Sequence, residues 1–230
     1  MDIIRKDHNL AKRTLIQSVL PSNGSSPSVL DVGCGYGGDI KKWFMTNPRI
    51  SLDMCDPSDD ALKEARSRAE SMGFSDRVQF YHGDISVCPN KKYNFICYNF
   101  SLHYIFENAK LFFKSIDEIR KRLLPGGVLF GCIPDSEHIL NMTPFQDDHG
   151  NFFARNMSNT GFGGFGEKVF VNLVDTPYYA DGPKAEPIAY KDLLITYLEQ
   201  RRLRLVNWSP LASPHSISKL YSQFIFVYKC

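Results

Sequence analysis

The chain has 230 residues, of which 43% are hydrophobic and 23% are charged, so it can bury one sizeable core but is short for several domains. We expect a single domain over residues 1–230 that carries one insertion. The formal net charge of +2 attracts a polyanion only weakly, which excludes a basic coat and leaves nucleic-acid binding, if any, to a local site.

The chain also lacks the patterns of membrane and secreted proteins. No stretch approaches the roughly 20 apolar residues of a membrane-spanning helix, and residues 1–8 lack the apolar core of a signal peptide. The cysteines form no C-x-x-C pair, and several lie in apolar strand-like runs, where a reduced cysteine acts as a small hydrophobe. They are Cys34, Cys55, Cys88, Cys97, Cys132 and Cys230. We therefore expect a soluble, unsecreted protein in a reducing compartment.

Strands and helices alternate through the first 133 residues. Apolar residues at helical spacing predict a helix over 6–20, which the Pro- and Ser-rich stretch 21–27 ends. A strand over 28–32 then runs into a glycine-rich turn at 33–38. The elements expected next are helix 39–45, strand 50–55, helix 58–71, strand 78–81, strand 93–98, helix 110–124 and strand 128–133. This alternation predicts a Rossmann-like α/β fold with a doubly wound, mostly parallel sheet covered on both faces.

The alternation stops between residues 134 and 187, where Asn, Gly, Phe, Tyr, Asp and Pro dominate and residues 161–166 read Gly-Phe-Gly-Gly-Phe-Gly. We interpret this segment as an insertion over the carboxyl edge of the sheet, where ligands of such folds bind. A helix over 190–201 and strands over 203–208 and 223–229 are expected to close the chain.

Glycines and acids follow the first three predicted strands. Gly33 and Gly35 begin a G-x-G-x-x-G match, which NAD and FAD proteins share. Asp31 precedes the turn, Asp56 ends the second strand, where it can hold ribose hydroxyls, and Asp84 follows the third, where it can accept from an adenine amino group. A lone aspartate is more often a helix cap or a solvated loop residue. The combination nevertheless suits an adenosyl group without a pyrophosphate.

Three motifs carry a resemblance that covers most of the chain. They are Asp-Val-Gly-Cys-Gly-Tyr-Gly-Gly-Asp-Ile-Lys-Lys-Trp at 31–43, Asn-Phe-Ser-Leu-His-Tyr at 99–104 and Leu-Pro-Gly-Gly at 124–127. The glycine turn and Leu-Pro-Gly-Gly occur in many methyltransferases, whereas G-G-D-x-x-K-W and F-x-x-H-Y are narrower signals. With them the chain resembles the mRNA cap guanine-N7 methyltransferases. In its compact length, the chain is similar to the methyltransferase module of capping enzymes of large cytoplasmic DNA viruses.

The resemblance implies methyl transfer from S-adenosyl-L-methionine to N7 of the guanine cap, converting GpppN-RNA to m7GpppN-RNA. It implies capped mRNA as the partner, with RNA triphosphatase and guanylyltransferase domains in the same polypeptide or complex, and no membrane. The implied localisation is the cytoplasm, that of an infected host cell if the protein is viral, with the nucleus as the alternative.

The resemblance also assigns a cofactor site. Lys12 is expected to reach the methionine carboxylate of the cofactor, whereas a helix lysine is otherwise a solvated one. The family usually has Gln where Asn99 stands, so a side-chain contact there would shorten and a backbone contact would survive. The predicted cofactor-binding residues are Lys12, Asp31, Gly33, Gly35, Asp56, Asp84, Asn99 and Tyr104.

The acceptor site is expected beyond the fourth strand. Glu186 matches a family acid that hydrogen-bonds the Watson–Crick edge of guanine, Tyr221 matches a family tyrosine near the cap, and Tyr36 replaces a usual lysine. Aromatic residues here could stack on a flat base, although a Phe or a His-Tyr pair is more often packing. The predicted cap-binding residues are Asn9, Tyr36, Phe100, His103, Pro134, Glu186 and Tyr221.

Guanine N7 carries a free lone pair at neutral pH, so we expect no catalytic acid or base and no metal. Glu186, His103 and Tyr104 are expected to act by positioning. Three alternatives stay open: a methyltransferase for a small molecule or protein side chain, a catalytically silent cofactor- or RNA-binding scaffold of a capping complex, and, as the weakest, an NAD oxidoreductase.

Overall fold

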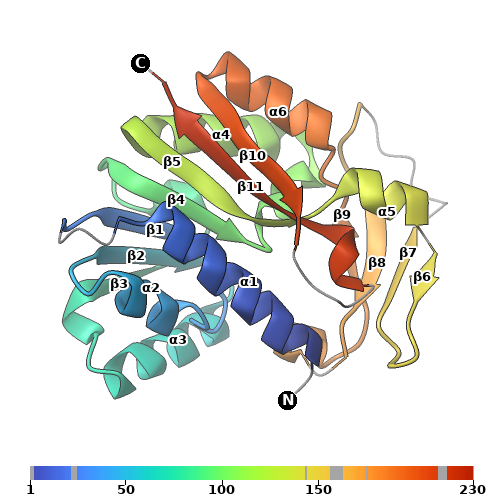
Figure 1. Cartoon of the computed structure of the whole chain (residues 1–230), viewed down its shortest axis with the longest axis horizontal. Helices are drawn as coiled ribbons and strands as arrows, with labels where there is room; N and C mark the ends of the chain where they lie inside the picture. The colour runs from blue at the N-terminus through green and yellow to red at the C-terminus, as the bar shows by residue number, and fades with distance from the viewer. Residues whose placement is uncertain are drawn as a thin grey trace.

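A computed structural model describes residues 3–21, 25–142, 144–155, 163–174, 176–211 and 217–229. It contains a seven-stranded sheet with helices on both faces and a separate four-stranded antiparallel sheet beside it (Figure 1). The large sheet is mostly parallel, which confirms the predicted doubly wound α/β class. None of the helices in the described ranges has the length and apolarity of a membrane span.

The strand order of the large sheet is β10-β11-β5-β4-β1-β2-β3. Neighbours from β3 to β5 pair in parallel, whereas β11 is antiparallel to both β5 and β10. The chain order reverses between β1 and β4, and in doubly wound sheets ligands bind at this switch point. The bounds are β1 Ser28–Val32, β2 Ser51–Asp56, β3 Val78–His82, β4 Tyr93–Asn99, β5 Leu123–Pro134, β10 Leu203–Pro210 and β11 Tyr221–Tyr228.

The two faces of the sheet belong to two hydrophobic clusters. Successive residues of β1 show the alternation, because Val29 packs in the cluster of α1 and α2, and Leu30 packs in that of α4 and α6. In Figure 1, α1 crosses the near face while α4 and α6 lie behind the sheet. The helices are α1 Ile3–Val19, α2 Ile40–Thr46, α3 Asp59–Ser71, α4 Ala109–Arg122 and α6 Lys191–Gln200.

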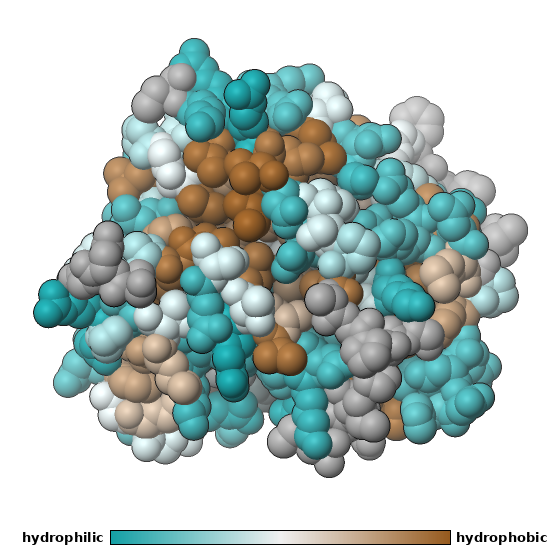
Figure 2. Space-filling model, in the orientation of Figure 1, coloured by the Kyte–Doolittle hydropathy of each residue, from teal (hydrophilic) through white to brown (hydrophobic). Residues whose placement is uncertain are grey.

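The near face is not fully covered by helices. Figure 2 shows hydrophobic residues gathered over β5, β10 and β11, above the level that α1 reaches. Val206, at an irregularity in the pairing of β10 with β11, is 61% exposed, and Val128 and Ile225 are partly buried. This part of the sheet therefore presents apolar side chains to solvent.

Some predicted boundaries were wrong. The first helix begins at Ile3, before the expected residue 6, and the helix expected over 110–124 ends at Arg122. Leu-Pro-Gly-Gly lies inside β5 because Leu123 already pairs with Tyr93, and the pairing is irregular before it resumes at Val128. The last strand begins at Tyr221, two residues before the expected start.

The segment after β5 has regular structure that its composition did not indicate. After α5 (Ser136–Met142), four short strands pair in the order β6-β7-β8-β9. In β8, Val169 and Val171 are buried while Phe170 is exposed, so this sheet too has one covered face. Residues 161 and 162 of the glycine-rich run lie outside the described residues. The strands are β6 Phe145–Gln146, β7 Phe152–Arg155, β8 Lys168–Asn172 and β9 Lys184–Pro187.

The cysteines lie mainly inside the fold, where they pack as small hydrophobic side chains. Those within the described ranges are free thiols, and all but the partly exposed Cys34 are buried. Cys230, also counted in the sequence, lies outside the described residues.

Candidate functional site

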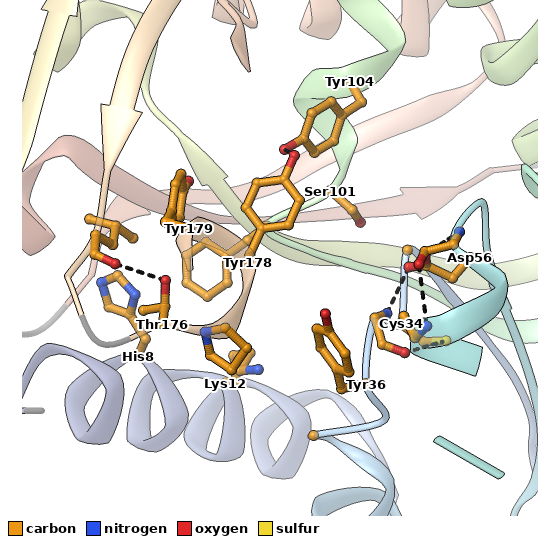
Figure 3. A pocket seen from close by; sticks show the side chains of 18 of the residues that line it. His8, Lys12, Cys34, Tyr36, Asp56, Ser101, Tyr104, Thr176, Tyr178 and Tyr179 are labelled. Carbon is orange, nitrogen blue, oxygen red and sulfur yellow. Dashed lines mark hydrogen bonds between the residues drawn. The ribbon is translucent and has the colours of Figure 1, made fainter. Parts of the chain in front are cut away.

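A cavity of about 620 Å³ lies at the carboxyl edge of the large sheet, within the usual size range of small-molecule sites (Figure 3). Its walls come from α1, the glycine turn, the end of β2, and the short helices η3 (Leu102–Glu107) and η4 (Pro177–Tyr179). The insertion adds β9, so the site joins the large sheet to the smaller one.

The glycine turn is held against the end of β2. The amides of Gly33 and Cys34 donate to Cys55 O at 2.8 and 3.1 Å, and Gly35 N donates to Asp56 Oδ2 at 2.7 Å. Gly33 has φ +72°, and a Cβ there would lie 2.4 Å from Ser101 Cβ. Only glycine satisfies both constraints. The turn therefore brings backbone close to the cavity, beside the Asp56 carboxylate.

The buried carboxylate of Asp39 pairs with two lysines behind the cavity wall. It pairs with Lys12 at 2.8 Å and Lys42 at 2.7 Å, and Asn99 Nδ2 donates to it at 3.0 Å. Burial by itself would raise the pKa of Asp39, but the two ammonium groups outweigh it and hold that pKa well below its usual range. Lys12 also lines the cavity, so its cation lies between Asp39 and the site.

Three predicted cofactor residues are not among those that line the cavity: Asp31, Asp84 and Asn99. Asp31 is buried and accepts from Trp43 Nε1 at 2.9 Å. Asp84 accepts from Ser86 N at 2.8 Å as the cap of η2 (Ile85–Val87), which is the alternative role open to a lone aspartate. Asn99 is held by Asp39. Their roles toward a cofactor stay predictions, whereas Lys12, Gly33, Gly35, Asp56 and Tyr104 do line the cavity.

At the other end of the cavity, Glu186 projects from β9 and is only 3% exposed. Its Oε1 accepts from Tyr179 OH at 2.6 Å and Tyr104 OH at 3.1 Å, and its Oε2 lies 3.1 Å from His103 Nε2. Burial raises the pKa of Glu186, but His103 and the two hydroxyls outweigh burial and leave that pKa below its usual value. The site thus holds an ionised carboxylate at neutral pH.

Two tyrosines of η4 that the sequence did not single out complete this end. Tyr179 binds Glu186, and Tyr178 OH lies 2.6 Å from Tyr104 OH. Figure 3 shows the ring of Tyr178 reaching into the cavity with its hydroxyl toward Tyr104. Burial and the nearby Glu186 raise the pKa of Tyr104 far above its usual value, so its hydroxyl stays a donor. The Pro-Tyr-Tyr run so close to Glu186 was the available signal.

Aromatic rings form one wall of the cavity. His8, which was also not predicted, stacks on Phe100 with ring centroids 4.9 Å apart, and Tyr221 meets Phe100 edge-on at 5.3 Å. Phe100 has φ +61°, a strained conformation for a residue other than glycine. Its amide donates to Cys132 O at 2.8 Å, which holds the backbone in place.

The residues predicted to bind a cap lie together. All of them line this one cavity: Asn9, Tyr36, Phe100, His103, Pro134, Glu186 and Tyr221. Tyr36 is 40% exposed at its rim, and Pro134 is the register partner of Tyr221 across β5 and β11. Within the described ranges, no group of three or more His, Cys, Asp or Glu side chains could hold a metal ion.

The family model of the mRNA (guanine-N(7))-methyltransferase domain matches residues 2–163. The mRNA cap guanine-N(7) methyltransferase of Schizosaccharomyces pombe is 31% identical over 163 residues, covering 64% of this chain and 44% of that protein. That of Caenorhabditis elegans is 31% identical over 156 residues, covering 60% of this chain and 40% of that protein. The chain thus spans less than half the length of these relatives.

Solved structures show the same fold at low identity. An S-adenosylmethionine-dependent methyltransferase from Clostridium acetobutylicum superposes with a TM-score of 0.63 at 15% identity, covering 100% of this chain and 93% of that one. The glycopeptide N-methyltransferase MtfA, solved with sinefungin, gives 0.63 at 16% identity, covering 96% and 93%.

Proposed function

Because the chain belongs to the mRNA (guanine-N(7))-methyltransferase domain family, we propose that it methylates N7 of the guanine cap of mRNA with S-adenosylmethionine as donor. The observation that carries the proposal is the ionised, buried Glu186, which shares one cavity with the glycine turn. Glu186 lies beyond residues 2–163, so the match to the family model does not include it, and what supports its role is its burial and its place in the cavity.

The glycine-turn end of the cavity fits the methyl donor. Asp56 offers a carboxylate for ribose hydroxyls, Gly33 and Gly35 leave room beside the backbone, and Lys12 offers a cation for the methionine carboxylate. When bound, S-adenosylmethionine would supply a methyl group that a nitrogen lone pair can attack, with S-adenosylhomocysteine as the leaving group. Since Lys12 pairs with Asp39 at 2.8 Å, we expect it to bridge Asp39 and the bound carboxylate.

The Glu186 end fits a guanine. Its aromatic wall, made by His8, Phe100 and Tyr221, offers stacking for a flat base. The Glu186 carboxylate accepts hydrogen bonds, which matches the ring N–H and amino groups of the Watson–Crick edge of guanine. Tyr104 and Tyr179 donate to Glu186 from the side and hold its orientation.

The chemistry follows from positioning and charge. The N7 lone pair needs no base to expose it, so the chain's contribution is to hold the base in line with the methyl group. Such ordering can supply roughly 7–11 kcal/mol of a barrier. As guanine becomes positively charged on methylation, its ring N–H becomes a better donor. The anionic Glu186 therefore binds the transition state more tightly than the substrate.

The test uses radiolabelled S-adenosylmethionine with two dinucleotide caps, one unmodified and one already methylated at N7. We expect label only on the unmodified cap. Label on both caps would place the methyl group elsewhere. Label on neither, with cofactor binding measured on the same sample, would favour the silent scaffold.

We further propose capped mRNA as the natural acceptor, with RNA triphosphatase and guanylyltransferase activities in the same polypeptide or complex. The chemistry supports this order, because those two reactions produce the GpppN end that is methylated here. The corresponding localisation is the cytoplasm, or the nucleus as the alternative. Fractionation of the native cells, with co-purification of guanylyltransferase activity, tests both points.

A further inference from the structure

A second cavity of about 410 Å³ lies between α1 and α2, outside the site described above. The two helices run side by side on the near face of the large sheet (Figure 1). The α1 residues lining it recur at helical spacing, so they form one face of that helix. This groove is lined by Lys6, Asn9, Leu10 and Arg13 from α1, and by Gly38, Lys41, Lys42 and Met45 from the α2 side.

Positive charge dominates the groove. Lys42 is paired with the buried Asp39 at 2.7 Å. Lys6, Arg13 and Lys41 are exposed, and within the described part of the chain none of them has an acidic group within ion-pair distance. Burial lowers the pKa of Lys42, and the repulsion of Lys12 and Arg13 lowers it further, whereas the paired Asp39 acts in the opposite direction. On a chain with a net charge of only +2, the groove is a local concentration of uncompensated charge.

The groove adjoins the main cavity. Asn9 and Gly38 line both, and Asn9 Oδ1 accepts from Lys42 Nζ at 2.9 Å. A polymer with one end in the main cavity would therefore pass Asn9 and Gly38 to reach the groove. Leu10 and Met45, 58% and 65% exposed, add apolar surface beside the cations.

We propose that this groove binds the phosphodiester backbone of the transcript immediately downstream of the cap. The inference rests on the proposed function, which places the cap in the main cavity. Lysine ammonium and arginine guanidinium groups are the usual partners of phosphate, and contacts of this kind add affinity without sequence preference. Apolar side chains at the rim suit ribose and base carbons.

The test is the triple variant Lys6→Gln, Arg13→Gln, Lys41→Gln. The matched control is Lys110→Gln, Arg204→Gln, Lys229→Gln, which removes the same charge from exposed residues on α4, on β10 and after β11. Both are assayed on a GpppG dinucleotide and on a capped RNA of about 20 nucleotides, after thermal melting and cofactor binding have confirmed the fold.

We expect the groove variant to raise KM for the long RNA by about fivefold to tenfold, with kcat and the dinucleotide KM unchanged. Binding of labelled RNA should show a log–log salt slope smaller by about 2, since each of three lost single-strand phosphate contacts removes roughly 0.7. The control variant should match the wild type in every readout.

An equal rise in KM for the dinucleotide would mean that the groove binds the cap itself. Unchanged RNA binding by the groove variant would mean that the groove binds no RNA. Either result overturns the inference. RNA binding also separates this inference from the proposed function. If the wild type methylates no cap but the groove variant still loses RNA affinity and salt slope, the groove inference stands and the proposed function fails.

Discussion

At the residue scale, the acceptor end of the cavity depends on one carboxylate. Glu186 is 3% exposed and yet ionised, because His103 and two tyrosines offset the cost of its burial. A buried anion is suited to a cationic or proton-donating partner. We expect the charge of Glu186 to contribute to acceptor binding as much as its shape does, and a substitution can separate the two contributions.

Glu186→Gln keeps the size of the side chain and one acceptor oxygen but removes the charge. We expect kcat for cap methylation to fall on the order of 10²-fold, because the interaction that strengthens in the transition state is lost. Cofactor affinity by calorimetry should be unchanged. Glu167→Gln is the matched control, since Glu167 also accepts from a tyrosine, Tyr190, but does not line the cavity. A parallel loss of cofactor binding would contradict the assignment of Glu186 to the acceptor end of the cavity.

Asp31 makes a separate prediction about stability. Burial, with the nearby Asp39, raises its pKa to about 7. The folded state then holds a proton that the unfolded state, with its ordinary pKa of 3.8, has released. The free energy of unfolding is therefore expected to fall as pH rises from about 4 to 7.

Asp31→Asn removes this titration and keeps an oxygen that accepts from Trp43 Nε1. Relative to the wild type, the variant should gain stability as pH rises from 5 to 8. Urea unfolding at both pH values measures the difference. A wild-type-to-variant difference that does not change with pH would contradict the raised pKa.

At the scale of elements, the large sheet could be predicted and the smaller one could not. The apolar runs that become β1, β2 and β4 are buried on both faces, so each stands out in the sequence. The five residues of β8 alternate over too short a span, and their pairing depends on partners distant along the chain. Strand pairing therefore had to be read from the structure.

The site shows the same division. The glycine turn follows from local geometry, and Glu186 came from the family resemblance. Tyr178 and Tyr179 reach Tyr104 and Glu186 only because η4 folds back onto η3, and no local sequence pattern predicts this contact. Asp84 shows a different limit, since an aspartate after a strand looks the same in sequence whether it caps a short helix or faces a cavity, and its cofactor role stays a prediction.

At the scale of elements, we predict the effect of a substitution at Gly131 on the pairing of β4 with β5. Gly131 lies inside β5, and a Cβ there would stand 1.9 Å from Tyr98 O on the paired strand β4. Gly131→Ala should force the two strands apart and lower the free energy of unfolding by about 1–3 kcal/mol or more. Gly38→Ala, where a Cβ meets nothing within 4 Å, should cost far less in the same urea titration. Equal losses would mean that β4 and β5 adjust freely.

At the scale of the whole molecule, the cavity is assembled from two parts. The glycine turn and Asp56 belong to the large sheet, and Glu186 belongs to the smaller one. The acceptor is thus expected to contact the smaller sheet through Glu186, whereas the donor contacts the large-sheet part of the cavity. A change at Glu186 should therefore leave donor binding intact.

Thermal melting tests this separation. A ligand that binds only the folded state raises stability by about 2.7 kcal/mol at a concentration of 100 times its Kd. S-adenosylhomocysteine, the demethylated donor, should therefore raise Tm of the wild type and of Glu186→Gln equally. Asp56→Asn should lose the shift, since its carboxylate lies at the donor end. A shift that disappears with Glu186→Gln would show that the two ends are not independent.

Asp39 carries one more consequence. Lys12, on the main cavity, and Lys42, on the groove, share its carboxylate, so the charge left for one depends on what the other binds. Two ligands connected in this way obey thermodynamic linkage, and linkage is reciprocal. If bound donor changes the affinity for RNA by some factor, bound RNA changes the affinity for the donor by the same factor. A transcript long enough to reach Lys42 would therefore alter donor affinity without contacting the donor.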